Sequence, residues 1–246
     1  MSENHNDHAP VALITGASKG LGLTLARFLA QRGYNLIINA RDPQRLSAAS
    51  ASLPTAAANH QAVAGDISDP DCRQRLLAAL QPLGRLDLLL NNASTLGPLP
   101  MPELVDYPPA ELQRVLEVNS VAPLALVQDT LPYLAAAGGL VVNMSSDAAG
   151  GGYAGWGGYG ASKAALDLLS ATLANELRDQ KISVVTVDPG DMRTDMHQDA
   201  FPGEDISDRP LPEVTLPFWA WLLGQDPAAI SGQRFQAQSE LWQVPA

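Results

Sequence analysis

Short apolar runs alternate along the chain with segments of helical periodicity, and this alternation restricts the fold more than any other feature. The first six runs are VALIT (11–15), NLIIN (35–39), QAVAG (61–65), LDLLLN (86–91), LVVNM (140–144) and ISVVTV (182–187). Their length and continuous apolar character indicate strands that are covered on both faces. A last strand is expected at QRFQAQ (233–238). The repeated strand–helix order predicts an α/β fold, a doubly wound parallel sheet of about seven strands with helices on both faces.

The chain has 246 residues, enough for a substantial core in one domain, although two small domains would also fit this length. We expect residues 1–9 to form a disordered polar N-terminus and residues 10–246 to form a single domain. The segment 191–217 interrupts the alternation because it is polar and contains several prolines. It follows the sixth predicted strand, at the edge where ligands bind in such sheets, so a substrate lid is favoured over a disordered surface loop.

The composition argues against several classes of partner. A net charge of -11 disfavours nucleic acid and an anionic membrane surface. The most apolar long window contains Gln128, Asp129 and two prolines, which makes it too polar to cross a bilayer. The first ten residues lack the basic and apolar regions of a signal peptide, and no metal site is expected there from His5 and His8. The single cysteine, Cys72, fits a reducing compartment, so a cytoplasmic location is predicted.

A glycine-rich turn, TGASKGLG, directly follows the first predicted strand and contains Gly16, Gly20 and Gly22. Glycine permits a tight turn and lets the backbone approach a pyrophosphate, while the amides at the start of the following helix attract its charge. Any tight strand-to-helix connection favours glycine. Its place in the first strand–helix–strand unit nevertheless favours a dinucleotide-binding site.

The end of the second predicted strand indicates which dinucleotide binds. Sites for NAD place a carboxylate there to accept hydrogen bonds from the adenosine ribose. In INARD this position holds Ala40 and then Arg41, whose planar guanidinium suits a phosphate, and Lys19 from the glycine-rich turn adds a second positive charge. The pattern favours NADP(H) over NAD(H). The alternative is that Arg41 is solvated and Asp42 turns inward to serve NAD.

Tyr159 and Lys163 are four residues apart at the start of a segment with helical periodicity, so their side chains point the same way. Taken alone, this spacing is equally typical of an amphipathic helix in which the tyrosine packs and the lysine reaches solvent. Its meaning depends on the other motifs of the chain.

These motifs together resemble the short-chain dehydrogenase/reductase family, in its compact single-domain form, over nearly the whole chain. They are TGASKGLG (15–22), GDI (65–67), NNA (91–93), Asn119, Ser146, Tyr159 with Lys163, and PG (189–190) followed by Thr194. The resemblance implies a Rossmann fold and an oxidoreductase that transfers a hydride between NADP(H) and a carbonyl or alcohol substrate. The competing hypothesis is a regulator on the same fold that senses NADP(H) without turnover. The set Asn119, Ser146, Tyr159 and Lys163 favours the enzyme, because a sensor would not need it.

The resemblance also implies a role for each catalytic candidate. Tyr159 would be the general acid/base, and Ser146, thirteen residues before it, would polarise the carbonyl, while Ser145 is expected only to bond the backbone. Lys163, together with the oxidised nicotinamide, would lower the pKa of the phenol and bind the nicotinamide ribose. Asn119 would hold a water molecule in the proton relay.

The expected cofactor contacts follow from the same motifs. They are Gly16, Ser18, Lys19, Gly20, Leu21, Gly22, Arg41, Asp66, Ile67, Asn92, Ala93, Tyr159, Lys163, Pro189, Gly190 and Thr194. Asn91 is expected instead to tie neighbouring strands together. Two positions depart from the family pattern, because Ser94 stands where a glycine is usual and Asp188 replaces a frequent asparagine. The family habit further implies a homodimer or homotetramer that packs through helices at 108–136 and 156–180.

Overall fold

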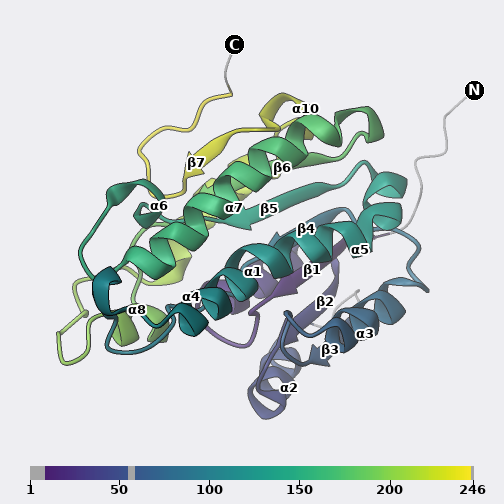
Figure 1. Cartoon of the computed structure of the whole chain (residues 1–246). Coiled ribbons are helices and arrows are strands. Elements are labelled where there is room, and N and C mark those ends of the chain that lie inside the picture. The colour runs from purple at the N-terminus through teal and green to yellow at the C-terminus, as the bar shows by residue number, and fades with distance from the viewer. Residues whose placement is uncertain (1–8, 55–58, 245–246) are drawn as a thin grey trace, which may run out of the picture.

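The framework of the molecule is one sheet of seven strands (Figure 1). The computed structural model describes residues 9–54 and 59–244. Its strands are β1 (Val11–Thr15), β2 (Asn35–Ala40), β3 (His60–Ala64), β4 (Leu88–Asn91), β5 (Leu140–Met144), β6 (Ser183–Asp188) and β7 (Arg234–Gln236). All neighbouring strands are parallel, in the order β3-β2-β1-β4-β5-β6-β7. Every predicted apolar run overlaps one of these strands, so the doubly wound parallel sheet is confirmed.

Helices cover both faces of the sheet. They are α1 (Gly20–Gln31), α2 (Pro43–Ala51), α3 (Pro70–Leu80), α4 (Pro109–Leu116), α5 (Ala122–Ala137), α6 (Ala148–Gly151), α7 (Gly157–Glu176), α8 (Asp195–Ala200), α9 (Leu216–Leu222) and α10 (Pro227–Ile230). Short 3₁₀ turns are η1 (Leu104–Asp106), η3 (Arg178–Gln180) and η4 (Pro212–Thr215), while η2 (Glu117–Val121) is a π-helical turn.

Two apolar cores hold these layers together. One core packs α1 and α9 against residues such as Ile14 and Ile38, and the other packs α3, α5 and α7 against residues such as Leu13 and Ile37. Successive residues of a strand point to opposite faces, so the two cores lie on opposite sides of the sheet. This explains why the strands read as continuous apolar runs. In Figure 1, α4, α5 and α7 lie across the near face.

The order of the strands fixes where a ligand can bind. The chain moves from β1 outward to β3, then returns to place β4 beside β1 and continues outward to β7. The connections that follow β1 and β4 therefore diverge, and in open α/β sheets this divergence opens a crevice at the carboxyl ends of the strands. The segment after β6, together with α6 and α8, lies at the same edge (Figure 1).

The segment 191–217 is partly helical rather than irregular throughout. The Thr194 hydroxyl oxygen accepts a hydrogen bond from the His197 amide at 3.2 Å and so caps α8. The Arg193 amide donates to the Pro210 carbonyl at 2.8 Å, which brings the two ends of the intervening loop together. A role as a lid stays a prediction.

Two expectations about the chain concern what it does not contain. Within residues 9–54 and 59–244, no helix combines the length and apolar character needed to span a membrane. In the same ranges, no cluster of three or more metal-ligating side chains is present. Residues 1–8, for which the sequence predicts disorder, lie outside the part of the chain that the structure describes.

Candidate active site

The glycine-rich turn after β1 is packed too closely to admit side chains. Gly16 has φ +68°, and a Cβ there would lie 2.9 Å from the Cα of Ala93. A Cβ on Gly22 would lie 2.3 Å from the carbonyl oxygen of Gly16. Gly20, with φ +54°, begins α1, whose first amides are free of intrahelical partners. The result is a backbone cradle at a helix N-terminus, which suits a pyrophosphate.

The connection after β4 is bound directly to this cradle. The side-chain amide of Asn92 donates to the carbonyls of Thr15 at 2.9 Å and Gly16 at 3.2 Å. The backbone amides of Asn92 and Ala93 both donate to the Thr15 hydroxyl. The side chain of Asn91 points the other way and donates to Asn143 on β5 at 2.8 Å, as expected of a strand tie.

Positive side chains gather at the end of β2. Arg41 is exposed at the carboxyl end of this strand, and Lys19 faces it from the glycine-rich turn, where both line one cavity. Asp42 is not free to serve a ribose, because its Oδ1 accepts hydrogen bonds from the Gln44 and Arg45 amides and caps α2. The cavity is therefore lined here by two cations and by Asp42, whose carboxylate caps α2 through Oδ1.

Two charged residues in this region were missed by sequence reasoning. Arg45, in the first turn of α2, lines the same cavity as a third cation. Asp195, at the start of α8, lies 2.7 Å from the Lys19 ammonium and 3.9 Å from the Arg45 guanidinium. Its hydrogen bond to Lys19 holds the pKa of the Asp195 carboxyl below its ordinary value. No local motif marks either residue, since each reaches the site only through the packing of its helix.

Asp66 and Ile67 line the cavity directly after β3. Burial acts to raise the pKa of the Asp66 carboxyl, but hydrogen bonds from Ser68 and the guanidinium of Arg114 hold it below the ordinary value. The carboxylate is therefore ionised and fixed, next to a buried apolar side chain, at the place where an adenine is expected.

Asn119 joins three parts of the site through its side chain. The amide nitrogen donates to the Thr95 carbonyl at 2.8 Å and to the Ser162 hydroxyl at 2.9 Å. The amide oxygen accepts from the Thr95 amide and the Ser94 hydroxyl. All donors and acceptors of the side chain are thus used by protein groups. The role of Asn119 in holding a relay water stays a prediction.

The π-helical turn η2 explains how Asn119 reaches this position. It lies between α4 and α5, which continue directly into it from either side. The wider turn presents Asn119, buried, toward the loop after β4 and toward α7. Turns of this kind inside α-helices are frequent at functional sites.

Tyr159 and Lys163 lie one turn apart on α7, as their spacing predicts, and the structure buries both side chains. The Lys163 ammonium donates to the Met144 carbonyl at the end of β5, at 2.8 Å, and lies 5.5 Å from the centre of the Tyr159 ring. Burial lowers the pKa of Lys163 to about 8, and a carboxylate one turn further along α7 opposes this.

Burial also raises the pKa of Tyr159 to about 12, while the hydroxyls of Ser146 and Ser94 lower it and the carboxylates of Asp188 and Asp147 raise it further. The surrounding protein groups therefore do not lower the pKa of Tyr159 as the resemblance implied, because desolvation of the phenolate outweighs their effect.

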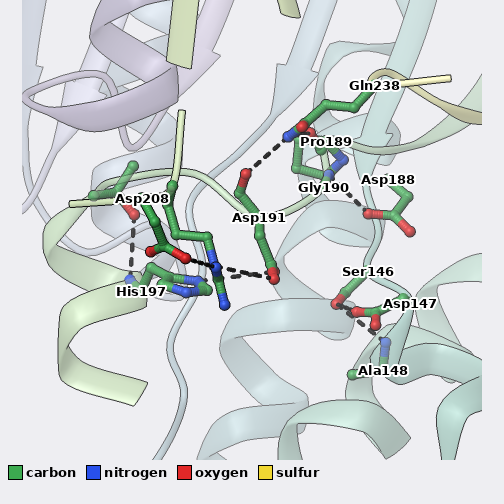
Figure 2. Close-up of polar contacts among 12 residues, drawn as sticks. Ser146, Asp147, Ala148, Asp188, Pro189, Gly190, Asp191, His197, Asp208 and Gln238 are labelled. Carbon is green, nitrogen blue, oxygen red and sulfur yellow. Dashed lines mark hydrogen bonds and ion pairs between the residues drawn. The ribbon is translucent and has the colours of Figure 1, made fainter. Parts of the chain in front are cut away.

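The two neighbouring serines after β5 have different surroundings. Ser145 is buried, and its amide donates to the Val187 carbonyl on β6 at 2.8 Å. The Ser146 hydroxyl donates to Asp147 at 3.1 Å, accepts from the Ala148 amide at 3.2 Å and acts on Tyr159 as described (Figure 2). Ser145 lines the cavity, and its buried hydroxyl has no hydrogen-bond partner within residues 9–54 and 59–244, so the expected backbone bond of this side chain is absent there. The choice of Ser146 as the catalytic serine stays a prediction.

Residues after β6 form another wall of the site. The side-chain amide of Gln238 donates to the carbonyls of Pro189 at 3.0 Å and Asp191 at 2.8 Å, and the Gly190 amide donates to Asp188 (Figure 2). Gly190 has φ +73°, and a Cβ there would lie 2.6 Å from the Gln238 amide nitrogen. These contacts fix the direction in which the chain enters α8.

A single cavity of about 490 Å³ connects most of these groups. The predicted residues that line it are Gly16, Ser18, Lys19, Gly20, Leu21, Gly22, Arg41, Asp66, Ile67, Asn92, Ala93, Tyr159, Lys163, Pro189 and Thr194. Asn119, Ser146 and Gly190 do not line it, although each bonds or adjoins a residue that does.

Apolar side chains cover the Tyr159 end of the cavity. Trp156 and Phe201 have ring centres 5.8 Å apart, and Trp156 lies edge-on to Tyr159 at 5.9 Å. Leu96 and Met196 pack in the same cluster. A second hollow of about 840 Å³ lies outside, between Leu99 and segment 198–205, and it shares Leu99 and Asp199 with the cavity. It forms an entrance bordered by α8.

The sequence and the fold are similar to those of known proteins. The family model described as short chain dehydrogenase matches residues 10–205. The uncharacterized oxidoreductase YciK of Escherichia coli K12 is 33% identical, with 93% of this chain and 91% of that protein covered. The serine 3-dehydrogenase of Agrobacterium fabrum is 36% identical over 74% of this chain and 72% of that protein.

A solved structure leads to the same conclusion. A protein from Escherichia coli CFT073, determined in complex with NADPH, superposes with a TM-score of 0.82 and 31% identity, covering 94% of this chain and 97% of that chain. The resemblance read from the motifs is confirmed by these matches. The chain belongs to the short chain dehydrogenase family of oxidoreductases.

Proposed function

We propose that the protein is an NADP-dependent oxidoreductase that transfers a hydride between the nicotinamide and a carbonyl or alcohol substrate. One observation carries this proposal: a single cavity runs from the cations of the glycine-rich turn and β2 to Tyr159 and Lys163. The similar protein from Escherichia coli CFT073 was solved with NADPH, which supports the choice of cofactor.

The residues present fit a dinucleotide phosphate. The glycine-rich turn keeps its tight shape because a Cβ on Gly16 or Gly22 would clash with the protein's own atoms, and the amides at the start of α1 would bind the pyrophosphate. Arg41, Lys19 and Arg45 would hold the 2′-phosphate, because the three cations outweigh Asp195, the carboxylate that pairs with Lys19 and lies near Arg45. At the other end of the cavity, Lys163 would donate to the ribose of the nicotinamide. When bound, the cofactor supplies the hydride.

Further residues would hold the rest of the cofactor. Asp66 and Ile67 would bind the adenine, and Asn92 and Ala93 would lie along the middle of the cofactor. Pro189, Gly190 and Thr194 would border its nicotinamide end. Thr194 also caps α8, so the same residue would couple the cofactor to the lid predicted at 191–217.

Tyr159 would move the proton during the reaction. In reduction its hydroxyl would donate to the substrate oxygen, and in oxidation its phenolate would accept the proton. A buried phenol with a raised pKa stays protonated, so it has a proton to donate in reduction, but it needs positive charge nearby to release that proton and act as a base. The Lys163 ammonium supplies part of that charge, and Ser146 would donate to the substrate oxygen and polarise the carbonyl.

The apolar cluster around Tyr159 favours a substrate whose body is uncharged. Trp156, Phe201, Leu96 and Met196 would contact the part of the substrate next to the reacting carbon. Carboxylates border the outer hollow, among them Asp199 and Glu204, so an anionic substrate would be repelled on entry. A small neutral ketone or aldehyde, or the matching alcohol, fits these surroundings.

The change Tyr159→Phe tests this function because it keeps the ring and removes the proton. Turnover of NADPH with a panel of reactive carbonyls should fall by about 100-fold or more, since general acid catalysis contributes about 10²–10⁴-fold. The dissociation constant for NADPH should stay close to the wild-type value. Tyr34→Phe is the matched control, because Tyr34 directly precedes β2 at the opposite edge of the sheet.

Two outcomes would contradict the proposal in different ways. Activity of Tyr159→Phe near the wild-type level would remove Tyr159 from the mechanism. Tight binding of NADPH by wild type without turnover of any carbonyl or alcohol would favour the sensor instead.

A further inference from the structure

Asp188 stands where the family pattern often has an asparagine, and it pairs with a positive side chain, Arg234, on the neighbouring strand β7. Asp188 ends β6 with a side chain that is 7% exposed, and its Oδ2 lies 3.4 Å from Nη2 of Arg234 on β7. Its Oδ1 accepts from the Gly190 amide at 3.0 Å. Burial raises the pKa of the Asp188 carboxyl, while the Gly190 amide and Arg234 oppose the rise. An asparagine would not need this cation, whereas the carboxylate does.

Arg234 makes two more contacts, and both lead toward the catalytic helix. Its Nη2 also donates to the backbone carbonyl of Ser146 at 2.9 Å, and its Nε donates to Asp167 on α7 at 3.1 Å. Asp167 lies one turn beyond Lys163 and acts to raise the pKa of that lysine. One guanidinium thus joins the end of β6, the segment after β5 and α7.

The phenol of Tyr159 responds to the groups that Arg234 holds. The charged and polar groups that face it are Lys163 from its own helix, Ser94 after β4, Ser146 and Asp147 after β5, and Asp188 from β6, with Asp199 of α8 lining the same cavity. Asp188 disfavours the phenolate and Ser146 favours it. Arg234 is bound to both.

We propose that Arg234 is a positioning residue that neutralises Asp188 and holds Ser146 in place, and that it thereby eases proton release from Tyr159. The proposal deepens the function proposed above and rests on it. In this arrangement a carboxylate at the end of β6 is compatible with acid/base chemistry at Tyr159 only because the neighbouring strand supplies its counter-charge.

A thermal double-mutant cycle tests the pairing without any turnover. Arg234→Met removes the charge and keeps the length of the side chain, leaving Asp188 buried without its cation. We expect the Tm to fall by about 2–4 °C. Adding Asp188→Asn should restore part of this loss, because the amide needs no counter-charge. If the changes in Tm caused by Arg234→Met and Asp188→Asn simply add in the double variant, the proposal is overturned.

The pH profile tests the link to Tyr159, and its sign distinguishes a charge effect from a structural one. With Asp188 uncompensated, the phenolate is disfavoured, so Arg234→Met should move the inflection of kcat/KM to higher pH in both directions of the reaction. A shift of about 0.5 pH unit corresponds to about threefold in rate. Alcohol oxidation should then be slower below the inflection, and carbonyl reduction should persist to higher pH than in wild type.

Two further variants serve as controls for the pH profile. Arg234→Lys keeps a positive charge and should restore most of the wild-type profile. Arg85→Met removes another partly buried arginine, paired with Asp87 at the start of β4, and should lower stability without moving the profile. The contrary result is that Arg234→Met lowers the rates of oxidation and reduction equally and leaves the inflection of the kcat/KM profile at the wild-type pH. That result would overturn the proposal and make Arg234 a structural residue.

The ionisation of Tyr159 can also be followed directly, so failure of the proposed function would be distinguishable. Tyrosinate absorbance is titrated in wild type and in Arg234→Met, with Tyr159→Phe in each background as the blank. An upward shift in Arg234→Met supports the role of Arg234 whether or not a substrate has been found. Coincident titrations would refute it.

Discussion

The role of Asp42 is decided by the helix that begins beside it. A carboxylate directly after β2 could have accepted hydrogen bonds from a ribose, but Asp42 already accepts from the amides of Gln44 and Arg45. N-caps of this kind contribute about 0.5–2 kcal/mol to stability, and this energy would be lost if the side chain turned inward. The sequence left two possibilities open, Arg41 binding the 2′-phosphate of NADP or Asp42 binding the ribose of NAD. The use of Asp42 as a helix cap favours the first.

Replacing Arg41 should therefore change the choice of cofactor. A charge-assisted hydrogen bond contributes about 1.5–3 kcal/mol, so Arg41→Ala should weaken NADPH binding by about one to two factors of ten and leave NADH almost unchanged. Arg41→Asp should go further, because a carboxylate repels the 2′-phosphate and can accept from the ribose hydroxyls. The dissociation constants of both cofactors are measured for each variant.

Arg178→Ala serves as the control, since Arg178 lies in η3, before the start of β6 and so at the opposite edge of the sheet. If wild type binds NADH as tightly as NADPH, or if Arg41→Ala weakens both cofactors equally, Arg41 does not recognise the phosphate.

The two serines after β5 provide a second test at this scale, each serving as the control for the other. Ser146→Ala should reduce kcat/KM by about 10²-fold or more, because it removes a donor that faces the developing charge on the substrate oxygen. Ser145→Ala should have a much smaller effect, because the backbone amide of Ser145, which the change leaves intact, makes its contact to β6. The reverse order would assign the role to Ser145.

Single residues also show where sequence reasoning ends. The spacing of Tyr159 and Lys163 predicted that they share a helix face, because that property is local. The pKa of Tyr159 depends on how completely α6, α8 and Trp156 exclude water from the phenol, and this burial is a property of tertiary packing. Arg45, Asp195 and Arg234 were missed for the same reason, since each acts across elements far apart in the sequence.

Among the elements, α7 depends on glycine to approach its neighbours. A Cβ on Gly160 would lie 2.5 Å from the backbone carbonyl oxygen of Ala148 in α6, and one on Gly158 would lie 2.4 Å from the ring of Tyr107. Gly160 thus lies directly against α6. Because α6 follows Ser146 directly, this contact sets the distance between the serine and Tyr159.

Gly160→Ala should therefore push α6 away from α7. Overpacking of this kind destabilises by about 1–3 kcal/mol, and the displaced Ser146 should lower kcat more than it raises KM for the cofactor. Chemical denaturation and steady-state kinetics measure the two effects. Gly150→Ala in α6 is the matched control, because its Cβ would have no heavy atom within 4 Å. Equal behaviour of the two variants would show that the close approach is unimportant.

The strands were predictable as elements, and the helix within 191–217 was not. A strand buried on both faces carries its own signal, a continuous apolar run, and all seven appeared at the expected places. The helix α8 depends on the Thr194 cap, and its loop is closed by the hydrogen bond between Arg193 and Pro210. These interactions leave no period in a polar sequence, so the helix could not be seen there.

At the scale of the whole molecule, the alternation of strands and helices predicted the layers of the fold. It did not predict the strand order, because the same alternation is compatible with any arrangement of right-handed crossovers. The order that places β4 beside β1 brings the glycine-rich turn next to Asn92 and Tyr159 to the same cavity. The site could thus be recognised from motifs, while its geometry required the fold.

Association of whole chains gives a further prediction. Leu168 on α7 is 71% exposed, and Val121 in η2 is also exposed, both within the segments expected to pack between subunits. Light scattering should give a mass that is a multiple of 25.9 kDa. Leu168→Asp should shift the population toward the monomer, because it places a charge in an apolar interface.

Leu241→Asp is the control for this experiment, since Leu241 is 77% exposed but follows β7, outside those helices. A monomeric wild type at micromolar concentration would contradict the prediction, as would equal dissociation by both variants.

In the π-helical turn at Glu117–Val121, the number of residues matters as much as their identity. Removing one codon inside the turn would let α4 and α5 join as an unbroken α-helix. A π-helical turn holds one residue more than an α-helical turn, so the loss converts it into an ordinary turn and removes the bulge that presents Asn119. Asn119 would then be carried away from Thr95 and Ser162 although it is itself unaltered. We therefore expect sequences that evolve from this one to tolerate substitutions in this turn far better than insertions or deletions.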